Sequence, residues 1–136
     1  MSPARLERFE AAIRVVLAFH DAYNRQDHDG VLEFLSDDCV FESPFPLPAG
    51  SRFVGKDELS GRLEELFRLP EAKLEAQEVF NAGTRCVLCW KLAPVGRLDD
   101  QEGFRGVDIF RVAGGLIREK LAYVHLGLWY YPDAHD

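Results

Sequence analysis

The sequence predicts an α+β fold in which helices come first and an antiparallel sheet follows. Up to Pro70, apolar residues recur at intervals of three and four, which is the spacing of amphipathic helices. After Pro70 they alternate with polar residues, which is the spacing of strands. Because the two patterns follow one another along the chain, a sheet of consecutive antiparallel strands is predicted and a parallel α/β sheet is not.

The composition limits the kind of molecule. A chain of 136 residues, 47% of them hydrophobic, suits one packed domain over residues 1–136. Its net charge of −7, without a basic patch, argues against binding to nucleic acid or to an anionic membrane surface. No apolar run approaches the roughly 20 residues of a membrane span, and the N-terminus lacks the apolar core of a secretory signal. We therefore expect a cytoplasmic protein that contacts neither nucleic acid nor membrane.

Three helices are predicted in the first half. The first covers about Leu6–Arg25, and a shorter one follows in a stretch that ends at Ser36–Asp38. The loop Pro44–Gly50 is rich in proline and is expected to be rigid. The third helix is expected to begin at Asp57 as its N-cap and to end before Pro70.

Five strands are predicted, one before the proline-rich loop and four in the second half. They are Cys39–Ser43, Leu74–Asn81, Cys86–Leu92, Phe104–Val112 and Leu116–Leu126.

The cysteines and histidines show no metal or redox pattern. Cys86 and Cys89 form a C-x-x-C motif, but it lies inside a predicted strand, so the two side chains would point to opposite faces. With Cys39 the count is three, which does not suggest a disulfide framework, and we interpret all three as buried and unreactive. No histidine pair has metal-ligand spacing. No metal and no cofactor are expected.

One aspartate of the predicted strand Phe104–Val112 stands out. Asp108 shares a strand face with residues that are all apolar or glycine: Phe104, Gly106, Phe110 and Val112. A carboxylate on an apolar wall is costly to ionise, so it must find a partner or keep its proton.

The turn after this strand decides which partner Asp108 meets. If Ala113–Gly115 is a three-residue hairpin loop, Lys120 lies directly opposite Asp108. A two-residue loop would place Leu121 there. Two interpretations of Asp108 follow: an acid or base in a pocket, or an ion pair with Lys120 that holds the strand register. The two are compatible.

The opposite face of the last two strands is also apolar. It carries Val107, Ile109, Leu121, Tyr123 and His125, beside Ile117. A small domain rarely has two cores, so a homodimer through this outer sheet face is expected.

Three stretches of sequence carry a resemblance to a known superfamily. They are Ala22–Asp27 with Val31–Asp38, then Val40–Pro44 with Val54–Asp57, and finally Gly106–Val112 with Gly115–Ile117. In their order and spacing they resemble the nuclear transport factor two-like superfamily, in its SnoaL-like and ketosteroid-isomerase-like branches. The resemblance implies a cone-shaped barrel (cystatin-like), in which a curved antiparallel sheet wraps around the N-terminal helices and leaves a deep apolar pocket. It also implies homodimers through the outer sheet face.

Ketosteroid isomerase offers a residue-by-residue test of this resemblance. That enzyme uses an aspartate base, with a tyrosine and a protonated aspartate as oxyanion hole. The oxyanion aspartate falls on Asp108 and is kept. The base falls on Ser43, the oxyanion tyrosine on Phe19 and a supporting tyrosine on Leu63. Steroid isomerisation by that mechanism is therefore not expected.

The resemblance and the residues together predict an isomerase, cyclase or hydratase type of enzyme. It would act on an apolar metabolite that bears a carbonyl or hydroxyl group. Asp108 would be the acid–base centre, assisted by Lys120 or by Tyr23, which lies one turn after Phe19 and could supply the missing hydroxyl. The expected substrate-binding residues are Phe19, Ser43, Leu63, Trp90, Phe104, Phe110 and Val124. One alternative is a protein that binds an apolar metabolite without catalysis. The other is a dimeric scaffold whose pocket is filled by its own aromatic residues, such as Trp90 and Trp129.

Overall fold

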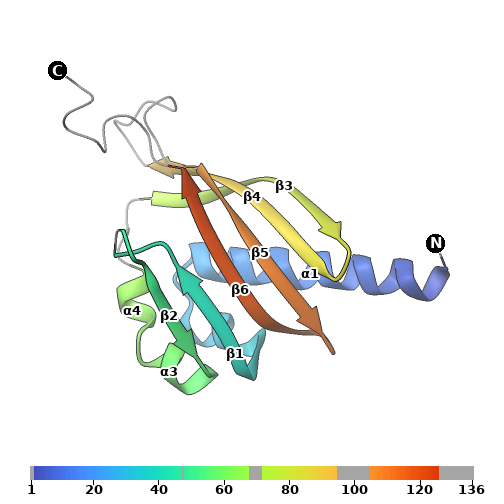
Figure 1. The fold of residues 1–136 in the computed structure, drawn as a ribbon, viewed down its shortest axis with the longest axis horizontal. Helices are drawn as coiled ribbons and strands as arrows, with labels where there is room; N and C mark the ends of the chain where they lie inside the picture. The colour runs from blue at the N-terminus through green and yellow to red at the C-terminus, as the bar shows by residue number, and fades with distance from the viewer. Residues whose placement is uncertain (1, 47, 68–71, 95–104, 126–136) are drawn as a thin grey trace.

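The α+β class is confirmed by a computed structural model, which describes residues 2–46, 48–67, 72–94 and 105–125. The described strands form one six-stranded sheet in the order β2-β1-β6-β5-β4-β3, and α1 lies against one face of it (Figure 1). The helices are α1 (Pro3–Asn24), α2 (His28–Glu33), α3 (Lys56–Ser60) and α4 (Leu63–Leu66). The strands are β1 (Leu35–Ser43), β2 (Ser51–Val54), β3 (Ala72–Ala82), β4 (Arg85–Pro94), β5 (Arg105–Ala113) and β6 (Leu116–His125). None of the described helices combines the length and the apolar character that a membrane span requires.

Helix α1 is held by its N-terminal cap and by one buried face. The Ser2 hydroxyl accepts a hydrogen bond from the backbone N–H of Arg5 at 3.2 Å, and Pro3 occupies a position where a helix needs no donor. The first turns of α1 reach beyond the strands (Figure 1). Its buried residues all lie in the second half: Val16, Phe19, His20 and Ala22.

The region after α1 differs from the prediction. Helix α2 ends at Glu33, and the stretch Ser36–Asp38 is already part of β1. The physical reason is backbone pairing with β6: the N–H of Ile117 donates to the carbonyl of Phe34 at 2.7 Å, and Leu35 pairs with Ile117. Contact with a distant strand therefore overrides a helix-like local sequence.

The segment between β1 and β3 also differs from the prediction. The short strand β2 was not predicted; it pairs with the end of β1 in antiparallel register. The predicted third helix is two short helices, α3 and α4. The N-cap of α3 is Gly55, with a φ of 95°, and Asp57 lies in the first turn.

The sheet is mixed, where antiparallel pairing throughout was predicted. β1 runs parallel to β6, and each of the other described strand pairs is antiparallel. A tight turn forces antiparallel neighbours, but no turn joins β1 to β6, which are the first and the last of the described strands.

Neither predicted register of the β5–β6 hairpin is correct. The turn is a two-residue loop, Gly114–Gly115, with φ values of 61° and 76° that favour glycine. The register then shifts between Arg111 and Val112, as a β-bulge does. The residue opposite Asp108 is therefore Ala122, and Lys120 lies opposite Phe110.

The core fills the space between α1, α2 and the inner face of the sheet. Its largest fully buried side chains are Phe19, Phe110, Leu35, Leu59, Leu63 and Leu88. A second, smaller cluster contains Trp90 and Leu92, with Phe45, Leu74 and Val124 packed against it. The inner face of β4 is formed by alternate residues that are all buried: Cys86, Leu88, Trp90 and Leu92.

Candidate ligand pocket and its buried ion pair

A cavity of about 530 Å³ lies between the sheet, the end of α1, the α3–α4 segment and the loop that follows β1. Its wall is mainly apolar and aromatic, which suits a small organic molecule. The apolar lining residues include Tyr23, Phe41, Phe45, Phe53, Leu66, Phe67, Leu74, Trp90 and Leu92.

Asp108 lies in the wall of this cavity with two polar partners. It is only 2% exposed. The indole N–H of Trp90 donates to its Oδ1 at 3.0 Å, and the Lys120 Nζ lies 3.8 Å from its Oδ2. Both contacts fix the orientation of the carboxyl group in the wall. Ala122, directly opposite on β6, is small and also lines the cavity, so the surface beside Asp108 is not covered.

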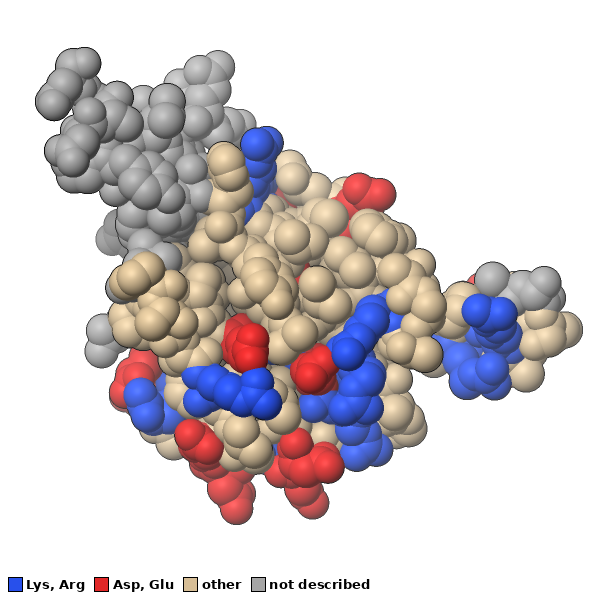
Figure 2. All heavy atoms as spheres, viewed as in Figure 1, with Lys and Arg blue, Asp and Glu red and all other residues tan. Residues whose placement is uncertain are grey.

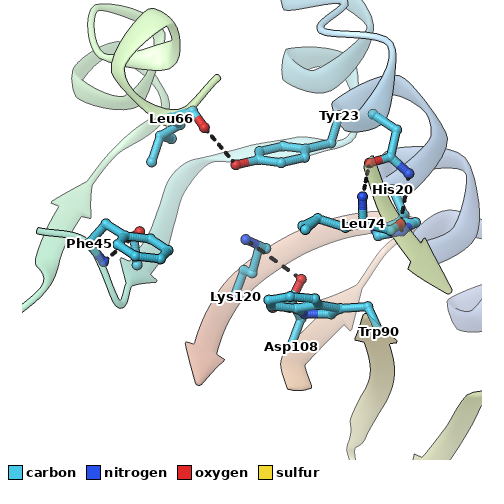
Figure 3. A network of polar contacts seen from close by, with 10 residues as sticks. His20, Tyr23, Phe45, Leu66, Leu74, Trp90, Asp108 and Lys120 are labelled. Atoms are coloured by element: carbon cyan, nitrogen blue, oxygen red, sulfur yellow. Dashed lines mark hydrogen bonds and ion pairs between the residues drawn. The ribbon is translucent and has the colours of Figure 1, made fainter. Parts of the chain in front are cut away.

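Lys120 reaches Asp108 diagonally across the hairpin. Its ammonium lies over the rings of Tyr23 and Phe41, 5.3 Å from each ring centroid. Such cation–π contacts attract an ammonium group to the faces of the rings. Figure 3 shows the amine pointing toward the space between Tyr23, Phe45 and Trp90.

Tyr23 lines the cavity, but its hydroxyl proton is engaged. The hydroxyl donates a hydrogen bond to the backbone carbonyl of Leu66 at 3.0 Å, which joins α1 to α4. Burial, and next the negative charge of Asp108, raise the pKa of Tyr23. The phenol therefore stays protonated, and its proton is directed at the protein backbone.

His20 is a buried polar residue near this site that the sequence did not indicate. Its Nε2 lies 2.5 Å from the carbonyl of Leu74, to which Asn24 also donates at 2.9 Å (Figure 3). Burial lowers the pKa of His20, although the hydrogen bond to Leu74 and the charge of Asp108 oppose this. The signal in the sequence is weak, because neighbouring residues of a helix point about 100° apart, so a histidine next to Phe19 does not share its face of the helix.

Polar residues gather at another part of the cavity wall. Arg62 forms an ion pair with Glu65 at 2.8 Å and lies over the ring of Phe53, 5.4 Å from its centroid. Gln26 donates to the carbonyl of Phe67 at 3.1 Å. No pattern in the sequence singles out Arg62, Glu65 or Gln26, since polar and charged residues in turns and short helices are usually solvated.

The predicted site residues fall into three groups. The cavity lining includes Tyr23, Ser43, Trp90, Asp108 and Lys120. The Ser43 hydroxyl accepts a hydrogen bond from the backbone N–H of Phe45 at 3.2 Å, so it also orders the loop after β1.

The second group lies behind the wall. Phe19, Leu63 and Phe110 are fully buried in the core and do not line the cavity. Val124 packs against the Trp90 cluster and lines a shallow neighbouring hollow. The third group, Phe104 with the tail residue Trp129, lies outside the described residues.

The described cysteines and acidic residues offer no metal centre. No three His, Cys, Asp or Glu side chains come together within the described ranges in a way that would hold an ion. Cys39 and Cys86 are buried, and Cys89 is half-buried; none is in a disulfide. Burial raises the pKa of Cys39, and it raises that of Cys86 to about 11, so both stay thiols at neutral pH.

Comparison with known proteins places this geometry in a family. The family model described as "SnoaL-like domain" matches residues 16–120, which is more than half of the chain. No curated protein matches the sequence. Among solved structures, an NTF2-like protein of unknown function from Mesorhizobium loti is 27% identical, with 87% of this chain and 93% of that chain covered and a TM-score of 0.69.

Two further structures share the fold at lower identity. One is a ketosteroid isomerase candidate from Kribbella flavida, 16% identical over 86% of this chain and 79% of that chain, with a TM-score of 0.68. The other is an LEH-like epoxide hydrolase from M. tuberculosis, 22% identical over 87% of this chain and 85% of that chain, with a TM-score of 0.65. At these identities the likeness shows a common fold.

Proposed function

This chain belongs to the SnoaL-like domain family. We propose that it is an enzyme that catalyses proton transfer in an apolar substrate bearing a carbonyl or hydroxyl group, and that the Asp108 carboxylate is the base. The fold is related to isomerases and hydrolases. Reactions of both kinds can proceed by acid–base chemistry without a redox step. A proton-transfer reaction in an apolar cavity is therefore consistent with the family and with the residues present.

The observation that carries the proposal is the placement of one carboxylate in an otherwise apolar wall. Asp108 is 2% exposed, yet it faces a cavity of about 530 Å³. Trp90 occupies one oxygen, and Lys120 lies beside the other at a distance longer than a hydrogen bond. A desolvated carboxylate with spare acceptor capacity can accept a proton from a bound molecule.

The two partners of Asp108 also hold its carboxylate in a fixed position in the cavity wall. The indole N–H donates to one oxygen, and the ammonium lies beside the other. A carboxylate held in one orientation is well placed to take a proton from a molecule bound in the cavity.

The test is proton exchange, because it requires no knowledge of the product. A panel of apolar ketones, enones and hydroxy compounds would be incubated with the protein in heavy water, and NMR would follow deuterium uptake beside the carbonyl. We expect Asp108→Asn to slow the exchange by about 10²-fold to 10⁴-fold, the usual contribution of a positioned base. The asparagine still accepts the Trp90 hydrogen bond, so the pocket shape is kept.

A matched control is Asp38→Asn, which changes a carboxylate whose side chain is 85% exposed on β1. It should leave exchange unchanged. If compounds bind, as thermal shift would show, but no compound exchanges or turns over, the protein is a binding protein and the proposal is wrong.

A further inference from the structure

Lys120 carries a buried ammonium whose donors the protein leaves largely unused. It is 8% exposed and lines the cavity. Its one ion-pair partner among the described residues is Asp108, at 3.8 Å, which is longer than a hydrogen bond. The ring centroids of Tyr23 and Phe41 each lie 5.3 Å from the ammonium nitrogen. An ammonium has three N–H donors, and a buried donor without an acceptor is costly, so this group is suited to an acceptor that arrives with a ligand.

The neighbouring hydroxyl and ring donors have protein acceptors. The Tyr23 hydroxyl donates to Leu66, and the His20 Nε2 lies at hydrogen-bond distance from the carbonyl of Leu74. The Trp90 N–H donates to Asp108 itself. Lys120 is therefore the group beside Asp108 that is available to polarise a ligand oxygen.

We propose that the Lys120 ammonium binds the carbonyl oxygen of the substrate and stabilises the enolate that forms when Asp108 removes a proton from the adjacent carbon. This inference rests on the proposed function and narrows its substrate class to enolisable carbonyl compounds with an apolar body. In the step, the C–H bond breaks and its proton forms an O–H bond with Asp108. The C–H electron pair becomes the new C=C bond, and the carbonyl π pair moves onto the oxygen.

The charge distribution favours this step. Before proton transfer the negative charge lies on Asp108, 3.8 Å from the ammonium, and afterwards it lies on an oxygen held by the same ammonium. The net charge of the pocket does not change, so the buried cation is paired throughout. A neutral carbonyl interacts weakly with Lys120 and an enolate interacts strongly, which is the difference that accelerates a reaction.

The same argument predicts which stable molecules bind. A phenolate resembles an enolate in charge and shape, and para-nitrophenol reports its ionisation by its absorbance. In the wild-type protein the phenolate is repelled by the Asp108 carboxylate. In Asp108→Asn that residue is neutral, as it is after proton transfer, so we expect the phenolate to bind at least about tenfold more tightly than in the wild type.

Lys120 is best tested in the Asp108→Asn background, where its removal leaves no unpaired buried charge. We expect Asp108→Asn/Lys120→Met to bind para-nitrophenolate at least about tenfold more weakly than Asp108→Asn alone. Lys120→Arg in the same background keeps a cation and should retain most of the affinity; it serves if the methionine variant does not fold. Equal phenolate affinity with and without the Lys120 cation, or binding of the phenol in its neutral form, would overturn the inference.

Two readouts separate this inference from the proposed function. If deuterium exchange depends on Asp108 but Lys120→Gln changes neither exchange nor phenolate binding, the Lys120 inference is wrong and the proposed function stands. If no carbonyl compound exchanges deuterium but phenolate affinity still depends on Lys120, the proposed function is wrong, and Lys120 is part of a site that binds anions.

Discussion

At the scale of single residues, the buried His20 ring is expected to make folding depend on pH. Burial lowers its pKa from the ordinary value of 6.5, so the folded protein holds it neutral. Below that value an unfolded chain takes up a proton that the folded protein does not. The contribution of His20 to the free energy of unfolding is therefore complete above about pH 6.5. It is lost as pH falls toward the lowered pKa, with a slope of up to about 1.4 kcal/mol per pH unit.

Urea unfolding at several values between about pH 7.5 and about pH 5.5 measures this slope, in a range where few carboxylates titrate. His20→Gln keeps a donor for the Leu74 carbonyl but does not titrate, so its slope should be flatter by about one proton. His28→Gln, at an exposed position of α2, is the matched control. A slope that is the same in wild type and His20→Gln would contradict this account.

The position of Asp108 was predictable from the sequence to a limited degree. Strand alternation placed it on the inner face, and a register error of two residues does not change the face, so Lys120 remained beside it. The bulge that set the true register leaves no clear pattern in the sequence. The Trp90 hydrogen bond was not predictable either, because it depends on how an indole lies across a neighbouring strand.

At the scale of secondary-structure elements, Gly106 on β5 determines how Trp90 of β4 lies. The two residues are directly paired. A Cβ at position 106 would lie 2.5 Å from the Trp90 ring and would also collide with the backbone carbonyl of Tyr123. The indole can therefore lie flat over β5, with its N–H directed at Asp108, only because residue 106 has no side chain.

Gly106→Ala should displace the Trp90 ring and destabilise the protein by about 1–3 kcal/mol, as overpacking does. Chemical denaturation would measure the loss, and near-ultraviolet circular dichroism would report the altered indole environment. Gly61→Ala is the control, since its φ is −71° and its added Cβ would lie 3.7 Å from the nearest neighbouring atom, the carbonyl oxygen of Glu58. Equal stability of the two variants would show that Trp90 has room to move.

The elements that were predicted correctly are those with long local patterns. Helix α1 and the strands β3 to β6 each have many apolar residues at one regular spacing. The type of each element can therefore be recognised even where its predicted ends differ slightly from the structure. The strand β2 has four residues and pairs with a strand that was itself predicted shorter, so no local pattern identifies it. The parallel pairing of β1 with β6 depends on the path of the whole chain.

At the scale of the whole molecule, the sheet presents its second face to the outside. α1 covers the inner face, and the register places a set of apolar side chains on the outer face of the central strands. We call this set the outer apolar patch: Val87, Cys89, Val107, Ile109, Leu121 and Tyr123. Figure 2 shows this face, with an uncharged area over the central strands and a band of acidic and basic side chains along one border.

The outer apolar patch leads us to propose that the protein forms a homodimer through this face. Tyr123, on the β6 side of the patch, is 53% exposed, which is unfavourable for a large aromatic residue in water. An apolar centre with a charged border is the usual anatomy of a protein interface. A second copy is the simplest partner, because a two-fold axis sets the same patch against itself and buries both at once.

Light scattering combined with size-exclusion chromatography should therefore give the mass of two chains for the wild type. Tyr123→Glu should shift the mass toward that of one chain, because two buried carboxylates would face each other across the axis. Leu17→Glu is the control: Leu17 is 39% exposed on α1, which packs on the other face of the sheet, so the dimer should persist. A wild-type mass of one chain at every concentration, or equal dissociation by both variants, would mean that the outer apolar patch does not hold two copies together.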